Sequence, residues 1–138
     1  MSKNAPERLA AALLAIEGLV LLIVAGWEIT ALVGGDSDDA GTSIALIVLT
    51  IIGAAAVLAF AVATGRGASW GRSGGIVTQL LMLAVALGAV TGPAPAPGFA
   101  AIVAVPAVLG LALLFLAARR AGARRRDAEP HEGAAAPH

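Results

Sequence analysis

The chain has 138 residues, of which 59% are hydrophobic and only 13% are charged, and its mean hydropathy is +0.90. Because soluble domains carry about 25% charged residues, this composition excludes a water-soluble globular protein and indicates a membrane protein. The formal net charge is zero and there is no cysteine, which excludes disulfides, thiolate chemistry and iron–sulfur ligation.

The first apolar run covers residues 9–33. At 1.5 Å per residue it would form a helix of roughly 37 Å, longer than a hydrocarbon layer of about 30 Å. Asn4 and Glu7 before it resemble a capping box at a helix start. A basic start followed by an apolar segment is also typical of a signal peptide, but this run exceeds the about 7–15 residues of such a segment. We therefore expect a membrane span.

Two carboxylates interrupt this span, Glu17 and Glu28. An ionisable side chain inside a span costs about 2.5–3.5 kcal/mol on insertion scales. Their separation along the helix corresponds to three full turns plus about 20° of rotation, so both side chains project from one face. We expect that face to point at other helices. Trp27, close to the end of the run, is expected at the headgroup level.

A short acidic connection follows, with three aspartates: Asp36, Asp38 and Asp39. Their carboxylates could ligate a hard cation, but the spacing is too short for an EF-hand and the distal Glu is missing, so a solvated turn is favoured. We expect Thr42 or Ser43 to cap the next helix.

The second span is expected over residues 44–64, with Thr50 as its interior polar residue, and the third over 75–91, with Thr78 and Gln79 near its start. Each carries small residues at intervals of four, which let another helix approach closely, although in the second span the abundance of alanine explains the pattern equally well. These are Ala55, Ala59 and Ala63 in the second span, and Ala84, Gly88 and Gly92 in the third.

The connection between these spans, residues 65–75, is glycine-rich. It follows no strand and lacks a Gly-Lys-Ser/Thr ending, so a phosphate-binding loop is not favoured. Trp70, flanked by Arg66 and Arg72, is instead expected to anchor the chain at the membrane interface.

The fourth span is expected over residues 99–118, and a basic tail follows it. Five arginines next to a span are typical of a cytoplasmic stop that attracts anionic headgroups, whereas nucleic-acid binding is the weaker alternative. They are Arg119, Arg120, Arg124, Arg125 and Arg126. Residues 127–138 are expected to be disordered, and His131 and His138 in them have no ligand partner, so no metal is assigned.

The positive charges lie at both ends of the chain and in residues 65–75, whereas the acidic and the proline-rich connections have none. The positive-inside rule therefore predicts that both termini are cytoplasmic. The expected fold is all-α: a polytopic up-down bundle of four transmembrane helices.

Counting along the helices predicts which polar groups meet. Glu17 lies roughly 12 Å and Gln79 roughly 8 Å from the cytoplasmic end of their spans, so they can share a layer. Burial favours a neutral Glu17, hydrogen-bonded to Gln79 or Thr78. A similar count places Glu28 near Thr50.

Four spans with Glu17 in the motif Ala15-Ile16-Glu17-Gly18 resemble the small multidrug resistance transporters. In that family the first-span glutamate binds protons and cationic drugs, a role that the resemblance would assign to Glu17. The chain differs in having no tyrosine, an additional Glu28 and a basic tail.

The stretch 66–83, Arg-Gly-Ala-Ser-Trp-Gly-Arg-Ser-Gly-Gly-Ile-Val-Thr-Gln-Leu-Leu-Met-Leu, together with the terminal arginines, is similar to small uncharacterised four-span proteins of actinobacterial type. That resemblance implies a four-span fold and a location in the bacterial cytoplasmic membrane, but no activity. The sequence shows no nucleophile–base pair and no metal cluster. We therefore expect a non-enzymatic accessory subunit without cofactors, whose partners are anionic lipid and other membrane proteins or a second copy. A proton-coupled transporter using Glu17 is the alternative.

Overall fold

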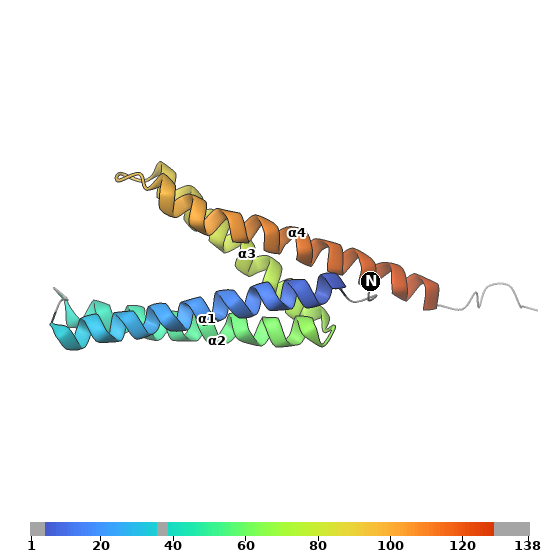
Figure 1. Cartoon of the computed structure of the whole chain (residues 1–138), viewed down its shortest axis with the longest axis horizontal. Helices are drawn as coiled ribbons and strands as arrows, with labels where there is room; N and C mark the ends of the chain where they lie inside the picture. The colour runs from blue at the N-terminus through green and yellow to red at the C-terminus, as the bar shows by residue number, and fades with distance from the viewer. Residues whose placement is uncertain (1–4, 36–38, 129–138) are drawn as a thin grey trace, which may run out of the picture.

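The computed structural model describes residues 5–35 and 39–128, and this part of the chain is helical with no strand. It contains four helices: α1 (Ala5–Gly34), α2 (Ala40–Gly65), α3 (Ser69–Thr91) and α4 (Pro97–Ala128) (Figure 1). Each is long and apolar enough to cross a membrane. The prediction of an all-α fold with four membrane-spanning helices is confirmed.

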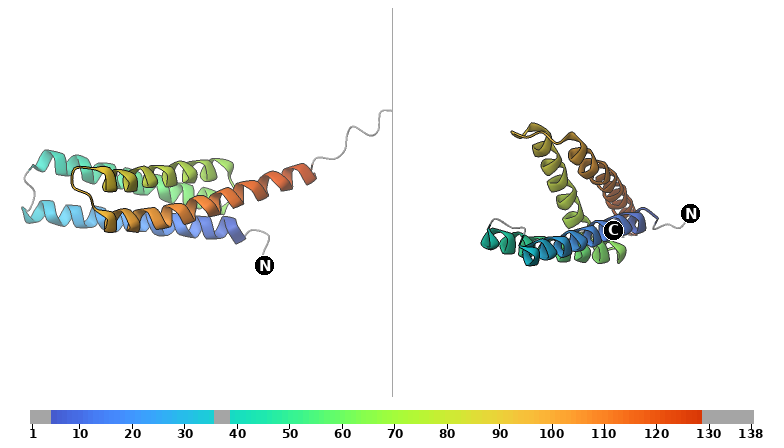
Figure 2. Two further views of the ribbon diagram at one scale, coloured as in Figure 1. Left: turned by 90° about the horizontal axis from the view of Figure 1, so that it is seen from above. Right: turned by 60° about the vertical axis from the view of Figure 1, so that its left-hand side comes forward.

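The helices form two antiparallel hairpins, α1 with α2 and α3 with α4 (Figure 1). The hairpins meet at one end and diverge toward the other, where the connections α1–α2 and α3–α4 lie (Figure 2). We call the meeting region the joint. It is formed by the start of α1, the end of α2, the start of α3 and the second half of α4.

A small apolar core fills the joint, and its most enclosed large side chains are Leu14 and Leu114. The other buried members are Ala10, Val57 and Ala61. The core therefore draws on α1, α2 and α4 together, and Ile76 of α3 packs against it. Because these contacts are confined to one end, the joint holds the two hairpins together.

Three glycines let α3 approach its neighbours in the joint. A Cβ on Gly71 would lie 2.6 Å from the backbone nitrogen of Thr64, and one on Gly74 would lie 2.3 Å from the Phe60 ring. A Cβ on Gly75 would lie 2.9 Å from Leu114. The sequence pattern predicts that these glycines lie in a connection ahead of the third span. They belong instead to the first turns of α3, where the missing side chains permit close helix packing.

The start of α2 also differs from expectation, because its N-cap is Asp39 and not Thr42 or Ser43. The Asp39 carboxylate accepts hydrogen bonds from the backbone nitrogens of Gly41 (3.1 Å) and Thr42 (3.3 Å), and from the Thr42 hydroxyl. An aspartate side chain satisfies the free N–H groups of a first helical turn well. The helix consequently begins at Ala40, four residues before the expected span.

α4 continues through Pro106 and past the expected end of the fourth span at residue 118. The arginine-rich segment therefore belongs to the helix, as do Asp127 and Ala128, which the sequence analysis assigned to a disordered tail. The remainder of that tail, residues 129–138, lies outside the described residues.

Candidate functional site

A hydrogen bond joins the two hairpins inside the expected membrane layer. Gln79 Nε2 of α3 donates to Glu17 Oε2 of α1 over 2.7 Å. The depth count had placed these two side chains in one layer, and the structure brings them into contact. Thr78, the other expected partner, donates its hydroxyl to the Gly74 carbonyl one turn earlier (3.0 Å).

The Gln79 side chain is held between helices. It is fully buried, and a Cβ on Gly110 of α4 would lie 2.7 Å from its Cδ. Glu17 is half-buried, and Gly18 beside it leaves room for Leu58 of α2. The absence of a side chain at Gly110 thus lets α4 pack directly on the Gln79 amide, and the absence of one at Gly18 lets α2 pack on α1 beside Glu17.

Two oxygen atoms of this pair accept no hydrogen bond. Among the residues that the structure describes, Glu17 Oε1 and Gln79 Oε1 are buried without a hydrogen-bond partner. An ionised carboxylate offers acceptors only, whereas a protonated carboxyl also offers one donor. A proton on Glu17 would therefore complete hydrogen bonding that the anion cannot.

Glu28 and Thr50, which the depth count places near one another, form no hydrogen bond with each other in the described part of the chain. The Thr50 hydroxyl donates to the Leu46 carbonyl of its own helix over 2.9 Å. Threonine within a helix commonly satisfies its hydroxyl in this way. Glu28 Oε2 is buried, and in the described part of the chain it has no hydrogen-bond partner.

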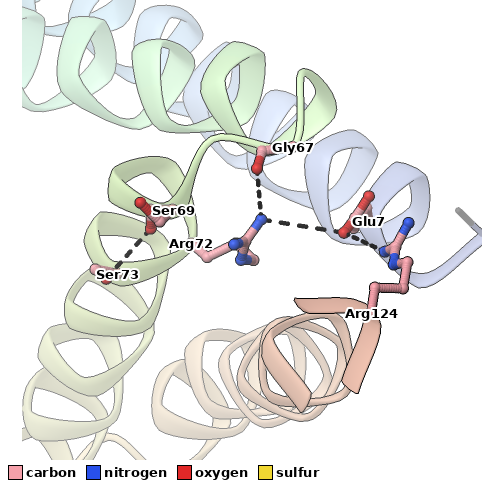
Figure 3. Close-up of polar contacts among 6 residues, drawn as sticks. All are labelled: Glu7, Gly67, Ser69, Arg72, Ser73 and Arg124. Carbon is pink, nitrogen blue, oxygen red and sulfur yellow. Dashed lines mark hydrogen bonds and ion pairs between the residues drawn. The ribbon is translucent and has the colours of Figure 1, made fainter. Parts of the chain in front are cut away.

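A buried ion cluster lies at the joint, close to the helix ends (Figure 3). Arg124 of α4 donates to Glu7 Oε1 of α1 over 2.8 Å, and the same oxygen lies 4.0 Å from Arg72 Nη1 of α3. Glu7 and Arg72 are each only 7% exposed. The cluster therefore links the first hairpin to both helices of the second.

Arg72 requires a correction, because the sequence analysis assigned it to the lipid interface. Its guanidinium is turned into the protein and donates to the Gly67 carbonyl over 2.8 Å (Figure 3). A buried cation is stable only where acceptors and an opposite charge replace water. Gly67 and Glu7 supply them, since the positive φ of Gly67 (77°) turns the chain between α2 and α3 at this point.

Sequence reasoning missed the role of Glu7, to which it gave a capping function. Its carboxylate instead faces the two arginines, and Asn4, the expected N-cap, lies outside the described residues. One signal was present in the sequence. The predicted topology places Glu7 at the same membrane end as every arginine, so an ion pair there was a reasonable expectation.

A cavity of about 330 Å³ opens beside this cluster, and we call it the joint cavity. It is bounded by eight residues from both hairpins: Glu7, Gly65, Arg66, Gly67, Arg72, Ala121, Arg124 and Arg125. Arg66 and Arg125 are exposed, and within residues 5–35 and 39–128 neither forms an ion pair.

The remaining residues that were expected at the membrane interface are exposed. They are Trp27, Trp70, Arg119, Arg120 and Arg126. Trp70 also packs edge-on against Phe60, with ring centroids 6.0 Å apart. Trp27 lies in the second half of α1, toward the α1–α2 connection, whereas Trp70 lies in the first turn of α3, at the joint.

The acidic connection is described only at Asp39, whose carboxylate serves as the cap of α2. The Thr42 hydroxyl, followed by the backbone N–H groups of Gly41 and Thr42, holds the pKa of Asp39 below its ordinary value. Asp36, Asp38, His131 and His138 lie outside the described residues. Within the described part there is no group of three or more His, Cys, Asp or Glu that could hold a metal ion.

The arrangement consists of a carboxyl–amide pair in the membrane layer and a charged cavity at the membrane end of the joint. Comparison of the chain with family models, with curated proteins and with solved structures found no match.

Proposed function

We propose that this chain is a non-enzymatic integral membrane protein of the bacterial cytoplasmic membrane that acts as a subunit, packing its diverging hairpins against other membrane helices. Both termini are proposed to be cytoplasmic, because every lysine and arginine lies at that end in the predicted topology. The partner is another membrane protein or a second copy of this chain.

The observation that carries this proposal is the contrast between the two halves of α3. Its first half uses Gly71, Gly74 and Gly75 for close contacts within the chain. In its second half Ala84 and Gly88 are exposed, and a Cβ on Gly88 would have nothing within 4 Å. Since association in lipid depends on close packing and polar contacts, this small-residue face is suited to a helix from another chain.

Glu28 supports the same proposal. It lies in α1 away from the joint, with a buried carboxylate oxygen that has no partner in the described chain. An ionisable side chain inside a span is costly where it faces lipid, so such residues usually face other helices. The half of the molecule beyond the joint thus combines a close-packing face with an intramembrane carboxyl group.

The test is purification of the tagged full chain in mild detergent, followed by mass spectrometry and measurement of the oligomeric state. Wild type should carry a stoichiometric partner, and Gly88→Leu should lose it because leucine fills the small-residue face. Gly26→Leu is the matched control, since Gly26 is also exposed with nothing within 4 Å of its Cβ position. A monomeric wild-type protein without a stoichiometric partner contradicts the proposal.

A second candidate function is proton-coupled transport through Glu17. The observation that favours it is the position of the Glu17–Gln79 pair between the two hairpins, with acceptor atoms that a proton on the carboxyl would satisfy. A transport carboxyl must bind and release a proton, which glutamine cannot do. A flux driven by a pH gradient in liposomes, present in wild type and absent in Glu17→Gln, would establish transport in place of the subunit function.

A further inference from the structure

The joint cavity carries a strong excess of positive charge. Four arginines and one glutamate line it, which leaves a formal excess of three positive charges around about 330 Å³. Like charges that line one cavity repel each other, and water screens part of this repulsion at the exposed arginines. An anion in the cavity would relieve this repulsion.

The arginines are arranged so that two are fixed and two remain available. Arg72 is held by the Gly67 carbonyl and Glu7, and Arg124 donates to the same Glu7 oxygen (Figure 3). Arg66 and Arg125 line the cavity from the exposed side, without an ion pair among the described residues. The single glutamate is therefore occupied by the two inner arginines and does not neutralise the outer two.

We propose that the joint cavity binds one phosphate group of an anionic phosphate ester. Guanidinium groups suit this ligand because their planar forks donate two parallel hydrogen bonds to phosphate oxygens. The volume lies at the lower end of the roughly 300–1,000 Å³ of small-molecule sites, which fits a headgroup. The cavity lies where the hydrophobic part of the helices ends, so a phospholipid headgroup and a soluble phosphate can both reach it.

This ligand would bridge the two hairpins. The lining residues come from α1, from the α2–α3 connection, and from α3 and α4. A ligand that binds only the assembled cavity stabilises the folded state by an amount that rises with the logarithm of the free ligand concentration above the Kd. This is a defined site, distinct from general attraction of the basic end of α4 to an anionic surface, and it does not depend on which protein partner packs against α3.

The test measures binding to the full chain in a non-ionic detergent at constant ionic strength, by titration calorimetry and by the thermal midpoint. The probes are dihexanoyl phosphatidylglycerol and inorganic phosphate. Arg66→Gln with Arg125→Gln removes two lining arginines. The matched control is Arg119→Gln with Arg120→Gln, which removes the same charge from exposed positions outside the lining. Because all four residues are exposed, both double variants should fold. Without ligand the control should keep the thermal midpoint of wild type, and the lining variant should equal or exceed it because two repelling charges are removed.

We expect saturable binding of phosphatidylglycerol that weakens on the order of tenfold to thirtyfold in the lining variant and less than about twofold in the control. The same pattern with inorganic phosphate alone would support the site and identify a soluble ligand as its source. Equal weakening in both double variants, or no saturable binding of either probe, would overturn the proposal.

Discussion

At the residue scale, two polar contacts join helices that are far apart in sequence. Gln79 of α3 donates to Glu17 of α1, and Arg124 of α4 donates to Glu7 of α1. Each contact links the two hairpins and has one buried partner, Gln79 or Glu7. Removing one partner should therefore cost more than removing an exposed residue, because the other partner is left buried and unsatisfied.

Glu17→Gln should behave like wild type in thermal unfolding in detergent, because an amide retains a donor and an acceptor of similar size. Glu17→Leu should lower the free energy of unfolding by about 1 kcal/mol, since it leaves the fully buried Gln79 without its partner. A leucine variant as stable as the glutamine variant would show that the hydrogen bond contributes nothing.

Glu7→Leu should destabilise the protein by on the order of 3 kcal/mol, because it leaves the buried Arg72 without its opposite charge. Arg124→Leu is the comparison. The Arg124 side chain is 46% exposed, and in this variant Glu7 still has Arg72 as an opposite charge, so the expected decrease in the free energy of unfolding is smaller. Thermal unfolding in detergent measures both variants, and the opposite order would contradict the central position of Glu7 in the cluster.

At the element scale, α3 has two parts with different surroundings. Its first turns are glycine-rich and pack closely on α2, whereas its second half exposes Ala84 and Gly88. Glycine is therefore required for packing at one end of α3 and replaceable, within this chain, at the other.

Helix termini also differ in how they are formed, since α2 begins at a side-chain cap and α1 is followed by Gly35 with a positive φ.

Gly71→Ala should lower the thermal midpoint strongly, because its methyl group would meet the backbone of Ala63 and Thr64 at 2.6–2.8 Å, which cannot move aside as a side chain can. Gly88→Ala should leave the midpoint unchanged or raise it slightly, since the position is open and alanine favours a helix. If both variants unfold alike, α3 does not pack against α2 as described.

The cap of α2 should make stability depend on pH. The pKa of Asp39 is held below its ordinary value by the Thr42 hydroxyl and by the backbone N–H groups of Gly41 and Thr42. The folded state therefore binds this proton more weakly than the unfolded state does. The contribution of the cap is complete above the ordinary aspartate range and is lost as the pH falls through the lowered pKa.

Helicity and thermal midpoint should be measured from about pH 6 to pH 3 for wild type, Asp39→Asn and Asp39→Ala. Asparagine caps a helix without titrating here, so its variant should lose the acid-dependent part of the wild-type curve. Alanine should give lower stability across the range. An asparagine variant with the full wild-type pH dependence would assign that dependence to other carboxyls.

At the scale of the whole molecule, two hairpins share one joint, and the polar features concentrate there. The ion cluster, the joint cavity and the Glu17–Gln79 pair all lie in or next to it. Beyond it the hairpins diverge and their apolar side chains are exposed, as expected for surfaces that lipid or a partner covers (Figure 2). The joint is thus the region where a ligand or a proton could alter the relation between the hairpins.

The proposed topology can be tested directly, since the protein has no natural cysteine. Cysteines at Ser37 and Ala96, in the α1–α2 and α3–α4 connections, should react with an impermeant thiol reagent on intact cells. A cysteine at Ser69, at the start of α3, should react only after permeabilisation. Labelling of Ser69→Cys on intact cells would contradict cytoplasmic termini.

The sequence by itself determined the class of protein and the number of spans, because apolar runs of about 20 residues have no other stable arrangement in lipid. It also placed Glu17 and Gln79 in one layer, since depth along a helix follows from counting residues. The sequence did not determine where the helices begin. The cap at Asp39 depends on local hydrogen bonds, and the inclusion of residues 71–75 in α3 depends on packing against neighbouring backbones.

Only the tertiary structure decided how the hairpins meet, and with it which arginines are buried. In the sequence Arg72 and Arg66 look alike, each beside glycines and close to Trp70. Arg72 turns inward because Glu7 and Gly67 come from other segments to meet it, whereas Arg66 stays exposed at the cavity. Glu28 and Thr50 lie at similar predicted depths yet do not pair, because depth fixes position along a helix axis and not rotation about it. That rotation is set by side-chain packing between helices, which no single segment of the sequence contains.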